Sequence, residues 1–134
     1  MRKVLLLAIT SLMVFSLAAE ASAAVKITKI NYKSSKVNGE YVVIKNTGTK
    51  TVALTGWTLR DLANHVYKFP TFSIKPGKVV TVYSGKGTST WNARYWGSSY
   101  FIWNDDGDTA SLKRKDGSLA SKCSYPGGGT YTYC

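Results

Sequence analysis

Hydrophobic and polar residues alternate in short runs along the chain from about residue 25 onward. In one such run Trp57 and Leu59 share a face, while Thr58 and Arg60 share the opposite face. A period of two is typical of β-strands, because successive side chains of a strand point to opposite sides. Val, Ile, Thr, Tyr and Trp, which favour strands, dominate the runs. The pattern predicts strands at 25–32, 40–46, 51–54, 56–61, 65–69, 79–84, 100–104, 109–115 and 118–123.

Turn-forming residues separate these runs. Asn38-Gly39, the sequence TGTK at 47–50, KPGK at 75–78 and Asp116-Gly117 all supply residues that suit tight turns. Residues 85–99 have no regular pattern and are predicted to form a long loop, unless they carry a short helical turn. Since no crossover helix separates the strands, we expect an all-β sandwich of two sheets. Its predicted core includes Leu54, Trp57, Leu59, Val80, Val82, Trp103 and Leu112.

The amino-terminal residues have a different pattern. A basic start precedes an uncharged apolar run at 4–19, and residues 21–23 read Ala-Ser-Ala, an arrangement that signal peptidase accepts. The run is short for a membrane span, and no second apolar stretch follows it. The sequence therefore predicts a cleaved secretory signal peptide at 1–23, one domain at 24–134 and an extracellular location, with no membrane span in the mature chain.

Cys123 and Cys134 are the only cysteines of the chain. An even pair in an exported protein usually forms a bridge, because the compartment is oxidising. The ten residues between them contain a Pro-Gly turn and three consecutive glycines, which allow the chain to fold back. We predict a disulfide that closes the segment 123–134 and holds the carboxyl terminus onto the domain.

The predicted mature chain is strongly basic, with 16 Lys and Arg against 6 Asp and Glu. Such a charge attracts polyanions, although it also serves solubility alone. Phosphate contacts need Lys and Arg, and stacking on bases needs exposed aromatic rings between them. Residues with this mixture occur in the irregular segment and in a basic run beyond it. The candidate polyanion-binding residues are Lys86, Trp91, Arg94, Tyr95, Trp96, Lys113, Arg114 and Lys115.

Each of these candidates has a structural alternative. Tryptophans in a long loop often fold back to cover the edge of a sandwich. The basic run 113–115 equally fits a solvated strand end. A carbohydrate-binding surface is a further role for the aromatic residues.

Three aspartates lie within 105–108. An EF-hand calcium loop needs oxygen ligands at its first positions and a glutamate at the twelfth, but with Gly107 as its glycine these positions hold Ile102 and Lys113. Asp106-Gly107 suits a type I′ turn, in which both central residues have positive φ. We predict a hairpin turn here and no metal site. A calcium site of another type and catalysis by paired carboxylates are the alternatives, although adjacent aspartates at the tip of a turn are normally solvated.

No catalytic constellation accompanies the single histidine. His65 follows Asp61 by four residues, and the chain has no G-x-S-x-G sequence near them. If the two residues flank a turn they can lie close together, but a pair without a nucleophile is not an active site. We predict that the protein is not an enzyme and needs no cofactor.

Longer stretches of the chain resemble a known family, the lamin tail domain, and in particular its small exported bacterial members. The resemblance covers residues 25–123 and implies an immunoglobulin-like β-sandwich without catalytic machinery. It also implies that the Asn46-Thr47-Gly48 turn, the strand at 56–59 and the segment 104–110 are framework elements, with Trp57 in the core. The stretches that carry it are NGEYVVIKNTGTKTVALTGWTLRD, HVYKFP, IKPGKVVTVYSGKGT, RYWG and WNDDGDTASLKRKDGS.

The chain departs from this family at Val43, where many relatives carry a second glutamate after the one that matches Glu40. The departure leaves this strand, with Lys45, more basic. The resemblance links the family to filament tails, nucleic acid and partner proteins. The resemblance indicates the fold far better than the partner. From the basic charge and the aromatic–basic residues, our first hypothesis is a secreted, non-catalytic module that binds an anionic polymer, either extracellular nucleic acid or a cell-wall polyanion. The second is a protein-interaction or structural module of the cell envelope.

Overall fold

The computed structural model describes residues 24–134, and the predicted signal peptide lies outside the described residues. Within them the chain forms short strands and one 3-10 turn, η1 (Val37–Gly39). The strands are β1 (Val25–Asn31), β2 (Tyr41–Asn46), β3 (Val52–Ala53), β4 (Thr58–Arg60), β5 (Val66–Lys68), β6 (Ser73–Ile74), β7 (Val79–Tyr83), β8 (Ala93–Tyr95), β9 (Asp108–Lys113), β10 (Leu119–Tyr125) and β11 (Tyr131–Tyr133).

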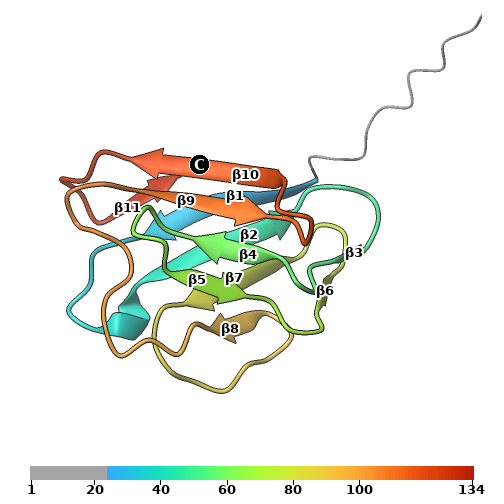
Figure 1. Cartoon of the computed structure of the whole chain (residues 1–134), viewed down its shortest axis with the longest axis horizontal. Helices are drawn as coiled ribbons and strands as arrows, with labels where there is room; N and C mark the ends of the chain where they lie inside the picture. The colour runs from blue at the N-terminus through green and yellow to red at the C-terminus, as the bar shows by residue number, and fades with distance from the viewer. Residues whose placement is uncertain (1–23) are drawn as a thin grey trace, which may run out of the picture.

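The strands form two main sheets that pack face to face. One sheet has the order β11-β1-β2-β7-β8 and the other the order β10-β9-β4-β5, while β3 and β6 form a small pair of their own. Figure 1 shows the four-stranded sheet in front of the five-stranded sheet, with β10 and β11 together at one edge. All pairings are antiparallel except that of β7 with β8. The predicted all-β, immunoglobulin-like sandwich is confirmed.

The core lies between the sheets and follows the predicted alternation. Val80 and Val82 of β7 point inward, and Ala110 and Leu112 of β9 face them from the other sheet. Trp103 is the largest fully buried side chain, with 2% of its surface exposed. Six of the seven predicted core residues are buried: Leu54, Leu59, Val80, Val82, Trp103 and Leu112.

Trp57 differs from its prediction, since it is only partly buried and packs against the margin of the core. It lies in the turn before β4, where its amide donates to the Leu54 carbonyl at 2.9 Å. The guanidinium of Arg114 lies 5.8 Å from the centre of its indole ring. The turn, rather than the strand, therefore sets the position of this ring.

The predicted strand at 100–104 is absent, and the segment is irregular. Its amides do not bond to a neighbouring strand, because those of Ile102 and Trp103 donate to the buried carboxylate of Glu40, at 2.9 and 3.4 Å. Conversely, the pattern missed β6, β8 and β11, which are only two or three residues long. β3, β4 and β5 are as short, but they lie within longer runs rich in strand-forming residues, which made them recognisable.

The predicted disulfide joins Cys123 to Cys134, with 5.7 Å between their Cα atoms. Cys123 lies in β10, the edge strand of the four-stranded sheet. Cys134 follows β11, the edge strand of the five-stranded sheet, and its amide donates to the Thr28 carbonyl. The bridge therefore closes the sandwich at the edge where both sheets end.

Candidate functional site

The outer face of the five-stranded sheet carries its side chains in rows, because residues in register on neighbouring strands lie side by side. One row runs Tyr131, Asn31, Tyr41, Tyr83 and Tyr95 across all five strands. Tyr41 and Tyr83 have ring centres 5.8 Å apart, and Tyr83 and Tyr95 have ring centres 5.2 Å apart. We call these four tyrosines the tyrosine row.

A lysine lies among these rings. The Lys29 ammonium is 4.7 Å from the ring centre of Tyr131, 5.5 Å from that of Tyr41 and 5.6 Å from that of Tyr133. Cations are attracted to aromatic faces at such distances. A hydrogen bond with Tyr41 raises the pKa of Lys29 above 10.5, against a smaller opposing effect of desolvation. The face therefore holds a positive charge among the rings at the β11 end of the tyrosine row.

A second row lies at the other end of the strands. Lys26, Lys45 and Val79 are in register on β1, β2 and β7. Thr81 and Ala93 are paired in the parallel β7–β8 register. Val79 is two residues before Thr81, and Trp91 is two residues before Ala93. Trp91 therefore extends the row beyond Val79. Trp91 is 69% exposed. Two lysines thus share a face of the sheet with an exposed indole, and Val79 lies between them and Trp91.

A hollow of about 410 Å³ opens beside Trp91 and is lined by Ser73, Ile74, Lys75, Lys78, Val79 and Trp91. The buried Asn46 fixes the turn that carries the two lysines. Its backbone amide donates to the Lys78 carbonyl, its carbonyl accepts from the Gly77 amide at 2.7 Å, and its side-chain amide donates to the Ile74 carbonyl at 2.9 Å. Gly77 has a φ of +72°, which the turn requires. The Trp91 patch, as we call it, comprises Lys26, Lys45, Lys75, Lys78, Val79 and Trp91.

The carboxylates of the described chain lie elsewhere. Glu40, Asp61 and Asp108 are buried. The three exposed carboxylates lie in the turns that flank β9, which belongs to the other sheet. No Asp or Glu of residues 24–134 forms a salt bridge with a lysine of the Trp91 patch. Among residues 24–134, the outward-facing side chains of the five-stranded sheet therefore include lysines and no Asp or Glu.

Comparison with known families decides the class of the protein. The Lamin Tail Domain model matches residues 18–127. The chain belongs to the lamin tail domain family. The family consists of non-catalytic immunoglobulin-like modules, so the chain is a module of the binding and interaction kind. A comparison with curated proteins found no match. Within residues 24–134, this lamin tail domain has no helix long and apolar enough to cross a membrane.

The irregular segment of this lamin tail domain distributes its candidate residues between two faces of β8. Trp91 and Tyr95 lie on the outer face, and the backbone places Arg94 and Trp96 on the inner side. The Arg94 guanidinium lies 4.3 Å from the ring centre of Phe72. Trp96 packs on Trp103, with ring centres 6.0 Å apart, so it covers the edge of the core. Only part of the predicted aromatic–basic loop therefore faces outward.

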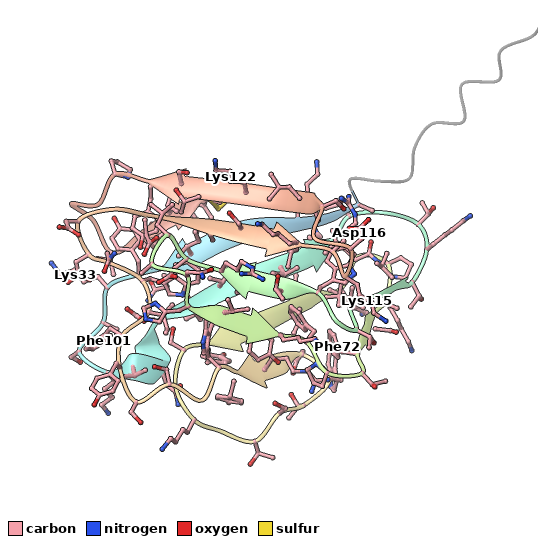
Figure 2. The ribbon with its side chains drawn as sticks, in the orientation of Figure 1. Lys33, Phe72, Phe101, Lys115, Asp116 and Lys122 are labelled. Atoms are coloured by element: carbon pink, nitrogen blue, oxygen red, sulfur yellow. A yellow bond between two sulfur atoms is a disulfide. The ribbon has the colours of Figure 1, made fainter. Side chains whose placement is uncertain are left out.

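The remaining candidates do not form one site with the Trp91 patch. Lys86 is exposed in the segment between β7 and β8. Lys113, Arg114 and Lys115 lie on the other sheet, where Figure 2 shows Lys115 beside Asp116 at the tip of the β9–β10 hairpin. Arg114 donates from Nη1 to the Leu119 carbonyl at 2.8 Å. The two groups of candidates, in the irregular segment and in the basic run, thus lie on different sheets.

Sequence reasoning missed the lysines of the Trp91 patch and three of the four residues of the tyrosine row. Alternation does place Tyr41, Val43 and Lys45 on one face of β2. It does not say which residues of other strands lie beside them. That information comes only from the pairing of strands up to about 100 residues apart in sequence.

The aspartate segment forms a turn at Asp105 and Asp106, as predicted, but not a hairpin, because no strand precedes it. Asp108 is buried, and its carboxylate accepts hydrogen bonds from the amides of Leu62 at 3.0 Å, Asn104 at 3.2 Å and Thr109 at 2.8 Å. It therefore fixes two loops against the start of β9. Among the described residues no three His, Cys, Asp or Glu side chains are grouped to hold a metal ion.

His65 and Asp61 do flank a turn, which joins β4 to β5. His65 Nδ1 lies 2.6 Å from Asp61 Oδ2, and the His65 amide donates to Asp61 Oδ1 at 2.7 Å. Asn64 within this turn has a φ of 65°. Both carboxylate oxygens of Asp61 are thus used to close the turn.

Proposed function

We propose that this lamin tail domain binds an anionic polymer through the outer face of its five-stranded sheet. The observation that carries the proposal is the Trp91 patch, in which Lys75 and Lys78 line a hollow of about 410 Å³ beside an exposed tryptophan, and Lys45 and Lys26 continue the same face across the neighbouring strands. Lysines that contact phosphates or other repeated anions release the counterions condensed on the polymer, and this release drives binding.

The four-stranded sheet also has a basic outer face, but two of its cations, Arg60 and Arg114, form hydrogen bonds with other groups of the protein. Arg60 donates from Nε to the Thr58 hydroxyl at 3.3 Å and from Nη1 to Asn64 Oδ1 at 3.1 Å. Arg114 bonds to the β9–β10 hairpin, and Asp116 lies beside it. The five-stranded face combines cations, exposed rings and a hollow, so it is the better candidate.

The proposed polymer is extracellular, either nucleic acid or a polyanion of the cell wall. Export is supported by the predicted signal peptide and by the Cys123–Cys134 disulfide, which is typical of oxidising compartments. A protein partner bound at a sheet edge is the competing function. The two differ in their response to salt, because an apolar protein interface is nearly insensitive to ionic strength.

The test is a titration of duplex DNA and of long-chain polyphosphate between about 50 and 200 mM salt. We expect the logarithm of affinity to fall linearly with the logarithm of salt concentration, by about 0.9 per phosphate neutralised. The double variant Lys45→Glu with Lys78→Glu should weaken binding and flatten the slope. The matched control is Lys68→Glu with Lys122→Glu, which changes the same charge on exposed lysines of the other sheet.

Binding of neither polymer would contradict the proposal. A loss confined to the Lys68 and Lys122 variant would contradict the choice of face. Binding that does not respond to salt would favour the protein-interaction function.

A further inference from the structure

The outer face of the five-stranded sheet carries more aromatic surface than binding to charge alone requires. At about 4.8 Å between neighbouring strands, the tyrosine row spans about 19 Å. The row lies about 13 Å from the Trp91 patch, since Tyr83 and Val79 are four residues apart on β7. Tyr131 and Tyr133 are among the exposed large hydrophobic side chains, as is Trp91. Five strands thus contribute to one surface of rings and lysines.

We infer that the anionic polymer is a single-stranded nucleic acid, whose bases stack on the tyrosine row and on Trp91 while lysines between the rings contact its phosphates. This inference rests on the proposed function, because it names the polymer that the same face binds.

Bases of a single strand are free to stack on aromatic side chains, whereas the bases of a duplex are already stacked on one another. Such stacking tolerates any sequence, because every base has a π face. Polyphosphate offers charge and no rings, so it cannot use the tyrosines. Among polyanions, a single strand is the one that matches both features of the face.

The positions of the lysines match this polymer. Lys29 lies within 5.6 Å of three tyrosine ring centres, where it can reach a phosphate next to a stacked base. At the other end of the face, Lys75 and Lys78 line the hollow beside the indole of Trp91. The volume of this hollow is within the range of small-molecule sites, so it has room for one base. Its two ammonium groups would then face the adjoining phosphates.

A neutral glycan is the competing ligand, because sugars also pack on aromatic surfaces. It would gain nothing from the lysines that accompany the rings: Lys26, Lys29, Lys45, Lys75 and Lys78. Charge complementarity therefore favours the nucleic acid.

The experiment compares three ligands of about 30 nucleotides: oligothymidylate, an abasic strand with the same phosphates, and a duplex. Fluorescence anisotropy at fixed salt gives each affinity. We expect oligothymidylate to bind about tenfold more tightly than the abasic strand. Tyr83→Thr should lower this ratio, because it removes one of the rings on which bases stack. Tyr83→Phe, which keeps the ring, should preserve the ratio.

Threonine favours strands, so the variant is designed to keep β7 in place. Trp91→Ala changes an exposed side chain and should lower the same ratio in a protein whose sheets are intact. Two variants at opposite ends of the face thus test the stacking surface independently.

Equal affinities for oligothymidylate and the abasic strand, unchanged by Tyr83→Thr and by Trp91→Ala, would overturn the inference while leaving polyanion binding in place. Failure to bind any of the three ligands or polyphosphate would instead overturn the proposed function. Salt-independent binding of a neutral β-glycan oligosaccharide, lost in Tyr83→Thr, would identify the face as a glycan site and also overturn the inference.

Discussion

The carboxylate of Glu40 accepts a hydrogen bond from the amide of Ile102 at 2.9 Å, across 62 positions of sequence. Glu40 immediately precedes β2 of the five-stranded sheet, and Ile102 lies on the path to β9 of the other sheet. The next residue, Trp103, is buried and contacts Trp96, which follows β8. A single buried carboxylate therefore supports the end of β8, the strand that carries Tyr95 on its outer face.

Glu40→Ala should destabilise the domain, because it leaves the amides of Ile102 and Trp103 without their acceptor. We expect the free energy of unfolding to fall by about 1–3 kcal/mol for each buried amide that stays unpaired. Urea denaturation measures the loss. Glu40→Gln keeps an acceptor oxygen and is the control; an equal loss in both variants would show that the amide hydrogen bonds are not the cause.

The same residue should make stability depend on pH. Burial raises the pKa of Glu40 above 4.5, against the lowering effects of the Ile102 amide, the Ser84 hydroxyl and the Trp103 amide. Because the folded-state pKa is the higher one, protonated Glu40 favours folding. Its contribution is full below about pH 4.5 and is lost as pH rises through the raised pKa. The stability of the native domain relative to Glu40→Gln should therefore decrease from pH 4 to pH 8, and a constant difference in denaturation across this range would contradict it.

Trp103, rather than Trp57, should be the tryptophan on which stability depends most. Trp103 is 2% exposed, and Trp57 is only partly buried at the margin of the core. Trp103→Ala should cost about 3–5 kcal/mol, as large-to-small core substitutions do. Trp57→Ala should cost less, since part of its ring is already in contact with water. Thermal and chemical denaturation of the two variants measures both losses of stability. An equal or larger loss in Trp57→Ala would contradict the prediction.

Removal of the disulfide should weaken the edge where both sheets end. Cys123→Ser with Cys134→Ser frees β11 and the chain end from β10. By the loop-entropy account, closure of so short a segment contributes about 3 kcal/mol. The difference in free energy of unfolding measures it. Mass spectrometry of exported, unreduced protein should detect no free thiol, and alkylation of both cysteines without reductant would contradict the bridge.

Calcium should leave the melting temperature unchanged. Asp108 is occupied by three backbone amides, and Asp105 and Asp106 are exposed on a turn. A site filled at a hundred times its dissociation constant would stabilise the fold by about 2.7 kcal/mol, which a thermal melt detects. A calcium-dependent rise of several degrees that is absent in Asp106→Asn would disprove this prediction.

Local pattern determined the class of structure and the two faces of most strands. Tyr41, Val43 and Lys45 had to share a side of their strand, because the extended chain alternates its side chains whatever it pairs with. The turn at 75–78 followed from its Pro-Gly sequence in the same way. The pairing of Cys123 with Cys134 also followed from the sequence, because the chain has no other cysteine.

Tertiary structure decided which of these faces meet. Lys26, Lys45, Val79 and Trp91 come from four separate segments, and only the strand register brings them into one row. Residues 100–104 have the pattern of a strand, but the amides of Ile102 and Trp103 bond to Glu40, more than 60 positions away. β8 has no strand pattern and yet pairs with β7. The side on which a residue lies is fixed by the geometry of its own few bonds, whereas its neighbours across the sheet are fixed by hydrogen bonding and burial summed over the whole domain.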